Sequence, residues 1–280
     1  MKTVVLVKGV PDFRQGHVKF KEDNTLDRGS TPTVLNPNDH LALQAALETQ
    51  VKHGGSTTLV SMGPPNYKKI IAEAMTIYGD RGALCSDIKL GGADTLATAW
   101  TLSAAIKKIG GVDLVFAGFK SADGETGQTG PQTAWLLGWP IVTHVTRIEI
   151  LPEERRFRAE RFVYDEIEEV EGPLPAVIVT DPGFRAEYRM ASHRLRLRDV
   201  TEATRERAKK ADTLVDTWTA ADLGVPEGVV GLRGSPTIVR VVEPIPAAPS
   251  ERTARVLDGA KMGDIEEAAR ILVAKAKGAA

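Results

Sequence analysis

Short β-branched runs alternate with longer helical patterns along the first part of the chain, which leaves few architectures open. The strand-like runs lie at residues 3–7, 57–61, 83–86 and 113–118, and the helical patterns lie at residues 39–52, 67–78 and 95–109. Strands separated by helices pair in parallel through right-handed βαβ units and bury both faces of the sheet. We therefore predict an α/β fold with a mostly parallel sheet flanked by helices. Asn38 is expected to cap the first helix, and Gly110 to end the third.

A different pattern begins near residue 141. Residues 141–150 and 157–163 flank a polar segment and predict an inserted antiparallel hairpin, and residues 174–180 predict a buried strand that returns to the sheet. Past residue 211, Pro and Gly recur with little periodicity until a last helical stripe at residues 264–277. This part is expected to form an extended arm and a helix.

The charge balance argues against two classes of partner. Lys and Arg number 36 and Asp and Glu number 37, so the net charge is −1. Nucleic acids and anionic lipids call for a clustered excess of Lys and Arg. No apolar run approaches the roughly 18 residues that span a bilayer, and the N-terminus lacks a secretory cleavage pattern. We expect a cytoplasmic protein that binds no nucleic acid and does not insert into a membrane.

Charge is nevertheless segregated along the chain. Residues 149–171 contain nine acids and four bases, whereas residues 185–210 contain nine bases and four acids. Such segments are either solvated faces or surfaces for a partner protein. The single cysteine, Cys85, excludes a disulfide framework and a Cys-rich metal site, and its apolar strand predicts an inert buried thiol. We predict neither a metal site nor catalytic residues, because no catalytic constellation is found.

The segment DLVFAGFKSADGETGQTGPQTAWLLGWP, residues 113–140, is the main candidate for a ligand site. A strand runs into a glycine-rich loop, and Pro131 is expected to open the following helix. Glycines let backbone N–H groups approach an anion, hydroxyls can donate to it, and the helix start adds its dipole. These features predict a phosphate site, with an ordinary strand-to-helix connection as the alternative. The glycines and hydroxyl residues concerned are Gly118, Gly124, Gly127, Gly130, Ser121, Thr126 and Thr129.

Other groups refine this site. The carboxylates of Asp123 and Glu125 would repel a phosphate, so we expect them to face ribose hydroxyls, ring nitrogens or solvent, whereas Lys120 could offset phosphate charge. Residues 7–12, 36–39 and 62–64 would converge on the same edge of the sheet and could wall an adenine pocket. The loop matches neither the G-x-G-x-x-G nor the G-x-x-x-x-G-K-[ST] fingerprint, which argues against phosphoryl transfer.

Segments spread over nearly the whole chain carry a family resemblance: VVLVKGVPD, LNPNDHLALQAALE, LVSMGPP, AMTIYGDRG, GADTLATAWTLSAAI, the loop segment above, LPAVIVTDPGFRAEYRMAS and SPTIVR. With them the chain resembles the β subunit of an electron transfer flavoprotein. In that family the β subunit is a Rossmann-like α/β nucleotide-binding domain. It pairs with a larger α subunit carrying FAD, and the heterodimer carries electrons between dehydrogenases and a quinone-linked acceptor.

The resemblance also implies what lines the nucleotide site. Ordinary members bind AMP there and show a D-x-D-C-N-Q-T-G-like loop, whereas ADGETGQTGP is closer to the D-G-x-T pattern of the bifurcating and Fix-type members, whose β subunit binds a second FAD. In that branch Thr126 and Gln128 would meet the diphosphate, and the adjoining cleft would admit NADH. The implied lining residues are Leu6, Asn36, Asp39, Met62, Gly118, Lys120, Ser121, Ala122, Asp123, Gly124, Glu125, Thr126, Gly127, Gln128 and Thr129.

The family recognises partner dehydrogenases through the loop after the LPAVIVT strand. This implies a docking loop near residues 182–198, with Phe184 as an exposed apolar anchor and Arg185 and Arg189 in a basic rim. We thus expect a nucleotide-binding domain over residues 1–210 and an arm over residues 211–280 that contacts the α subunit.

The leading hypothesis is an electron-carrier subunit with a second, bifurcating FAD that serves dehydrogenases or NADH and a quinone- or ferredoxin-linked acceptor. Two alternatives stay open. One is the same subunit with a structural AMP, and the other is a free-standing adenine-nucleotide sensor or ATP-hydrolysing α/β protein.

Overall fold

The computed structural model describes residues 1–12, 32–186, 211–238 and 257–276 of the chain. The chain divides into two compact units, Met1–Arg240 and Val241–Ala280. The first unit holds the sheet and the predicted site, and the second holds one described helix, α8 (Met262–Ala276).

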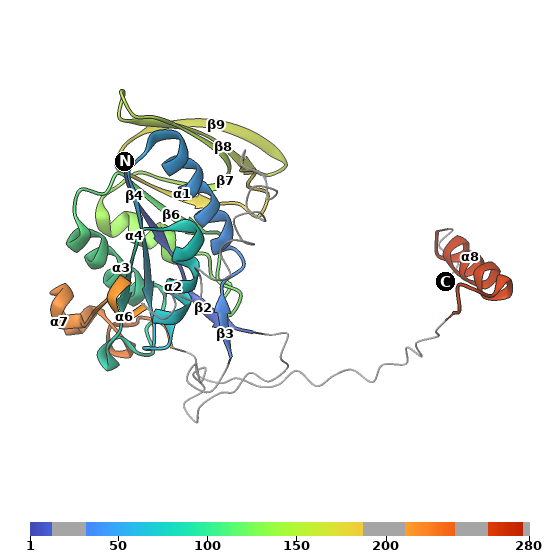
Figure 1. The fold of residues 1–280 in the computed structure, drawn as a ribbon, viewed down its shortest axis with the longest axis horizontal. Coiled ribbons are helices and arrows are strands. Elements are labelled where there is room, and N and C mark those ends of the chain that lie inside the picture. The colour runs from blue at the N-terminus through green and yellow to red at the C-terminus, as the bar shows by residue number, and fades with distance from the viewer. Residues whose placement is uncertain (13–31, 187–210, 239–256, 277–280) are drawn as a thin grey trace. The chain divides into compact units, whose positions relative to one another are not determined.

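A large sheet forms the centre of the first unit (Figure 1). It has nine strands in the order β11-β5-β4-β1-β6-β10-β7-β8-β9. Neighbours from β11 to β7 are parallel, and β7, β8 and β9 pair antiparallel. A small separate sheet pairs β2 (Gly9–Pro11) with β3 (Thr33–Leu35). The strands of the large sheet are β1 (Lys2–Leu6), β4 (Ser56–Met62), β5 (Arg81–Cys85), β6 (Leu114–Gly118), β7 (Ile141–Leu151), β8 (Arg156–Val163), β9 (Glu166–Pro173), β10 (Ala176–Thr180) and β11 (Val215–Trp218).

Helices cover both faces of this sheet. Successive strand residues point to opposite faces, so Val5 of β1 shares a buried cluster with α1 and α2, whereas Val4 shares one with α3 and α4. The predicted α/β class, with a mostly parallel sheet between two helical layers, is confirmed. The helices of this unit are α1 (Asp39–His53), α2 (Tyr67–Tyr78), α3 (Thr95–Ile109), α4 (Thr129–Leu137), α6 (Ala211–Leu214) and α7 (Ala220–Leu223), with 3-10 turns η2 (Ile88–Leu90), η3 (Glu227–Val229) and η4 (Leu232–Gly234).

The observed boundaries agree closely with the sequence pattern. Helices α2 and α3 have the predicted bounds, α1 is one residue longer, and the hairpin after residue 141 is present as β7 and β8. Pro131 is the third residue of α4 rather than its first. The position is still compatible with proline, because the first-turn N–H groups have no partner within the helix.

The sequence pattern did not predict β2 and β3 of the small sheet, nor two strands of the large sheet. Strand β9 (EIEEVEGP) adds a third strand to the hairpin, and β11 pairs with β5 in parallel. Because β11 extends the sheet, residues 211–238 belong to the first compact unit, which runs to Arg240. The boundary expected at residue 210 is therefore corrected.

The acidic segment around β9 is largely paired within the hairpin. Arg158 on β8 lies 2.7 Å from Glu171, 3.1 Å from Glu169 and 3.6 Å from Glu149, all measured between side-chain nitrogen and carboxylate oxygen. These pairs are exposed, so each contributes little alone. They nevertheless explain how adjacent glutamates are tolerated in one strand, because opposite charges face one another across the strands.

Helix α8 in the second unit confirms the predicted last helix. It exposes several apolar side chains, namely Met262, Ile265, Ile271, Leu272 and Val273. Across the described residues, helices are either too short or too polar to traverse a bilayer.

Candidate functional site

The strand order reverses between β1 and β6, and the region beyond the carboxyl ends of these two strands is called the crevice below. The chain moves from β1 to β4 and β5 on one side of β1, and then crosses to β6 and β10 on the other. Leu6 and Ala117 are paired in register, so the ends of β1 and β6 lie side by side. Open α/β sheets bind ligands beyond the carboxyl ends of the strands, at the point where the strand order reverses.

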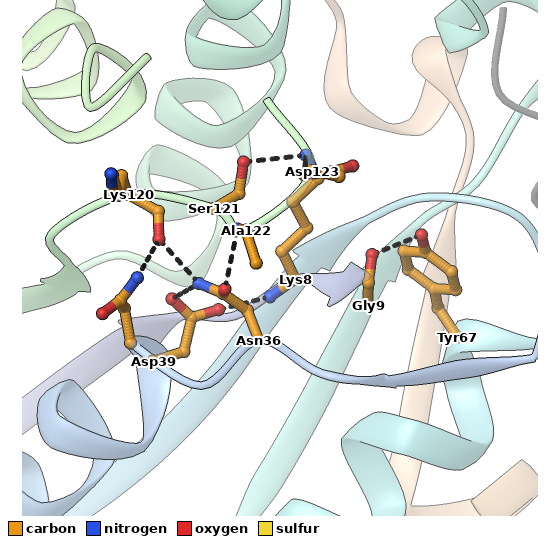
Figure 2. A network of polar contacts seen from close by, with 10 residues as sticks. Lys8, Gly9, Asn36, Asp39, Tyr67, Lys120, Ser121, Ala122 and Asp123 are labelled. Carbon is orange, nitrogen blue, oxygen red and sulfur yellow. Dashed lines mark hydrogen bonds and ion pairs between the residues drawn. The ribbon is translucent and has the colours of Figure 1, made fainter. Parts of the chain in front are cut away.

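Two asparagines hold the loop after β6 in place, and Figure 2 shows the contacts of one of them, Asn36. The Asn36 amide donates to the carbonyl oxygen of Lys120 at 3.0 Å, and its Oδ1 accepts from the backbone N–H of Ala122 at 3.1 Å. Asn38 Nδ2 donates to the same Lys120 carbonyl at 2.8 Å. The backbone of the loop is thus held in one position by the side chains of Asn36 and Asn38, which lie just before the first residue of α1.

Asp39, the first residue of α1, forms the buried centre of this network. Its Oδ1 accepts from Asn36 Nδ2 at 2.7 Å, and its Oδ2 accepts from the backbone N–H of Lys8 at 2.8 Å. Burial raises the pKa of the Asp39 carboxyl to about 7, against the lowering effect of these two hydrogen bonds. A Cβ added to Gly118 would collide with Asp39 Oδ1 and would lie 2.8 Å from the carbonyl carbon of Asn38, so only glycine fits there.

Two lysine–carboxylate ion pairs involve the loop after β6. Lys8 Nζ lies 2.6 Å from Asp123 Oδ1 and donates to Ser121 Oγ at 3.2 Å, which joins the end of β1 to the loop after β6. Lys120 Nζ lies 3.3 Å from Glu125 Oε1, in a more exposed pair. Figure 2 shows Lys8 reaching toward Ser121 and Asp123.

The second half of the loop leads into α4. Glu125 and Gly127 both adopt positive φ values, +52° and +64°, so the backbone turns sharply before the helix. The side chains of Thr126 and Gln128 are exposed, and Thr129 is the first helical residue. A Cβ on Gly130 would lie 2.9 Å from Val179 Cγ2, because the start of α4 packs closely on β10.

The structure brings most of the predicted residues together. Asn36, Asp39, and the loop from Gly118 to Asp123 form one contact network, and Gly124 to Thr129 continue it to α4. Leu6 is buried, and Met62 packs half-buried against the same α3–α4 cluster. These two side chains therefore belong to the sheet face opposite α1.

Sequence reasoning missed one contributor, Tyr67. It placed Lys8 and Asn38 in segments that could wall an adenine pocket and gave Asn38 a capping role, but it did not foresee their side-chain contacts with the loop after β6. Asn38 makes no side-chain cap contact, because its amide donates to the loop. The Tyr67 hydroxyl donates to the Gly9 carbonyl at 2.5 Å, and Cβ atoms on Gly9 or Gly63 would collide with its ring. The glycines that follow β1 and β4 were the available signal for this close packing.

The expected docking anchor is corrected. The Phe184 side chain is only 7% exposed and belongs to the core cluster of the α1 face, so it is not an exposed apolar anchor. The backbone explains this, because the N–H of Arg185 donates to the Thr146 carbonyl and draws the segment against β7. Arg185 is exposed, as predicted for a basic rim, whereas Arg189 and residues 187–198 lie outside the described residues.

Cys85 is buried as predicted, and burial raises the pKa of its thiol to about 12. Such a thiol is protonated at neutral pH and is a poor nucleophile. Within the described ranges, three or more His, Cys, Asp or Glu side chains never gather in a way that could hold a metal ion.

Comparisons with known proteins agree with this architecture. The model of the electron transfer flavoprotein domain matches residues 23–222. The chain is 36% identical over 275 residues to protein FixA of Azorhizobium caulinodans, covering 96% of this chain and 90% of that protein. It is 35% identical over 240 residues to the electron transfer flavoprotein subunit beta of Clostridium acetobutylicum, covering 86% of each. It is 34% identical over 245 residues to subunit CarD of the caffeyl-CoA reductase-Etf complex of Acetobacterium woodii, covering 85% of this chain and 86% of that protein.

Proposed function

The chain belongs to the electron transfer flavoprotein family, among its beta subunits and FixA proteins, and from this premise we propose that it binds a second FAD in the crevice between β1 and β6. The family implies an alpha-subunit partner in a redox complex. One observation carries the assignment of the site. The loop after β6 is fixed across the reversal point of the sheet and leads directly into α4.

The residues present fit a group that contains a diphosphate. Thr126 and Gln128 offer an exposed hydroxyl and amide, and Gly127 turns the backbone toward the start of α4, where N–H groups and the helix dipole favour an anion. The strand-end segments around Lys8, Asn36 and Met62 would enclose the adenine. A bound flavin supplies the exchange of electrons, and the chain positions it and tunes its charge environment.

Counting cofactors tests the choice between FAD and AMP. The chain is co-produced with its alpha subunit, the complex is denatured, and the released flavin and AMP are quantified per heterodimer. We expect two FAD and no AMP. One FAD and one AMP would refute the second flavin and would leave an ordinary beta subunit with a structural nucleotide. Hydrolysis of ATP by the isolated chain would favour the sensor or ATP-hydrolysing alternative.

A double variant tests the loop itself. Thr126→Val combined with Gln128→Ala should lower the cofactor content of this site and leave the alpha-subunit flavin in place. Thr217→Val is the matched control, because Thr217 is also exposed but lies on the edge strand β11. Unchanged cofactor content in the double variant would place the ligand elsewhere.

We further propose that this chain and its alpha subunit form a bifurcating complex. This complex would pass electrons from NADH or a dehydrogenase to a quinone- or ferredoxin-linked acceptor. The relative CarD is a subunit of a caffeyl-CoA reductase-Etf complex, which supports a partner enzyme for this chain. With Phe184 buried, the proposed docking surface rests on the basic segment that starts at Arg185. Reversal of charge by Arg185→Glu should slow electron delivery to the partner without changing the flavin content.

The second unit is proposed to contact the alpha subunit. Its helix α8 exposes Ile265, Leu272 and Val273, which is an unusual amount of apolar surface for one helix. A chain that ends after Arg240 should lose co-purification with the alpha subunit or weaken it at least tenfold. Full retention would show that the first unit is sufficient for assembly.

A further inference from the structure

We propose that His144, together with Asp181 and Phe119, forms the subsite for the half of FAD that lies beyond the diphosphate, and that this subsite selects FAD over AMP. The inference deepens the proposed function and rests on it, because it takes the ligand to extend past the start of α4. His144 and Asp181 lie outside the lining that the family resemblance implies, so the proposal adds two residues to the site.

A bulge in β7 sets the position of His144. Residues 142–145 of β7 pair with residues 178–180 of β10, so β7 contains one extra residue there. His144 lies in this bulge with φ +59°, within a strand, whereas the other described non-glycine residues with a positive φ lie in loops and turns. Bulges redirect side chains and are frequent next to active sites. The bulge therefore makes His144 a candidate for contact with a ligand.

Asp181 orients the imidazole ring of His144. The Gly183 N–H donates to Asp181 Oδ1 at 2.7 Å, and Asp181 Oδ2 lies 3.1 Å from His144 Nδ1. An ionised carboxylate only accepts hydrogen bonds, so this contact assigns the proton to Nδ1. Nε2 makes no hydrogen bond to any described residue, and the His144 side chain is 39% exposed. Nε2 is therefore available to a ligand.

The ring of His144 also packs against the loop after β6. Its centroid lies 4.9 Å from the centroid of Phe119, and the two ring planes are 58° apart. Phe119 directly follows β6 and precedes Lys120, whose carbonyl oxygen is fixed by Asn36 and Asn38. Two aromatic rings and one available ring nitrogen thus lie together. The isoalloxazine of FAD is a planar ring system with N–H and C=O groups, which suits such a surface.

The strand order places this subsite beyond the proposed position of the diphosphate. The strands follow one another as β4-β1-β6-β10-β7, and the proposed function puts the adenine after β1 and β4 and the diphosphate at the start of α4, which follows β6. The start of α4 packs on β10, since a Cβ on Gly130 would lie 2.9 Å from Val179 Cγ2. Asp181 directly follows β10, and His144 lies in β7, the next strand along the edge. AMP ends at its phosphate, so only FAD has a second half to occupy this position.

The test measures how much AMP is needed to displace the second FAD. The heterodimer is dialysed against a fixed concentration of FAD and increasing concentrations of AMP, and bound FAD is counted per heterodimer. The measured quantity is the AMP concentration that halves the occupancy by the second FAD. A change that loosens the adenine and phosphate contacts weakens both ligands and leaves this concentration nearly unchanged, whereas loss of a contact to the second half of FAD lowers it.

Two variants remove the imidazole ring. His144→Gly and His144→Asn both tolerate the positive φ of the bulge, so the backbone is kept. Tyr164→Gly is the matched control, because Tyr164 also has a positive φ, +48°, but is 96% exposed in the turn between β8 and β9. Asp181→Asn, alone and combined with His144→Gly, tests the orientation of the ring.

We expect both His144 variants to lower the displacing AMP concentration about tenfold and Tyr164→Gly to leave it within about twofold of wild type. Asp181→Asn alone should lower it about threefold and should add nothing to His144→Gly, because Asp181 acts through the ring. An Asp181 effect that persists without the ring would refute its orienting role.

Two failures are distinguishable. A second FAD that wild type and the His144 variants release at the same AMP concentration would overturn the inference, as would an equal fall in Tyr164→Gly, and either result would leave the proposed function intact. A wild-type heterodimer that holds one FAD and one AMP would refute the proposed second FAD itself, and the subsite with it.

Discussion

Replacement of Asn36 by alanine tests the network that fixes the loop after β6. The Asn36 side chain is 1% exposed and makes three hydrogen bonds, to Asp39 Oδ1 at 2.7 Å, to the Lys120 carbonyl at 3.0 Å and from the Ala122 N–H at 3.1 Å. A neutral buried hydrogen bond contributes about 1 kcal/mol, and one to an ionised carboxylate contributes about 2 kcal/mol. We expect Asn36→Ala to lower the free energy of unfolding by about 4 kcal/mol.

Asn38→Ala is the matched control. Asn38 lies two residues away on the same segment, and its side chain makes one hydrogen bond to the loop, 2.8 Å to the Lys120 carbonyl. Its loss should lower the free energy of unfolding by about 1 kcal/mol. Both variants are unfolded with urea at about pH 8, where Asp39 is mostly ionised because the pKa of its carboxyl is about 7.

The comparison also separates anchoring of the loop from general packing. Loss of Asn36 removes the hydrogen bond that most lowers the pKa of Asp39, so that pKa should rise further. The free-energy loss of Asn36→Ala should consequently be larger at about pH 8 than at about pH 5. Equal losses for the two asparagine variants, or a loss that does not depend on pH, would refute the network as described.

Substitutions at three further positions, one of them with a control at Gly124, test other parts of the structure. Because burial raises the pKa of Asp39 from 3.8 to about 7, its contribution to stability is complete below about pH 4 and is lost as pH rises through 7. Asparagine does not titrate, so the free energy of unfolding of Asp39→Asn minus that of wild type should rise by about 4 kcal/mol between about pH 4 and pH 8. If the two proteins showed the same pH dependence in urea unfolding, this expectation would be contradicted. Gly118→Ala should destabilise by about 2 kcal/mol through its collision with the start of α1, whereas Gly124→Ala in the same loop, with Ser121 Oγ at 3.4 Å, should be nearly neutral in thermal unfolding. Phe184→Ala should lower the free energy of unfolding by about 3 kcal/mol because the ring is buried. A stability equal to that of wild type would instead indicate that the ring is exposed, as the sequence predicted.

The sequence predicted regular elements well where local signals agree with one another. Helix α3 begins after Asp94, whose side chain accepts from the Ala97 N–H, and it ends at Gly110 with φ +64°. Both are standard terminal signals, and the bounds were predicted without error. The parallel sheet followed from the same regularity, because short buried strands alternate with such helices.

The elements that were missed depend on contacts between distant segments. Strand β9 is dominated by glutamates, and its pairing with β8 is supported by arginines such as Arg158. Strand β11 has four residues inside a stretch rich in Pro and Gly, and it is defined only by its register with β5. The burial of Phe184 depends likewise on the contact of its segment with β7. No local pattern contains this information.

The start of α1 shows why the internal contacts of the proposed site were not predictable from the sequence. Asn38 has helical dihedral angles, φ −69° and ψ −26°, and gives up the capping contact that its residue type predicts. The Asn38 amide instead donates to the loop after β6. The neighbouring Asp39 is buried, and this burial raises the pKa of its carboxyl to about 7. Helix α2 also begins at an asparagine with helical dihedral angles and no side-chain cap contact, Asn66, so the absent cap alone does not mark a site. What distinguishes the start of α1 is that its side chains contact a distant loop, and a sequence pattern cannot show such contacts.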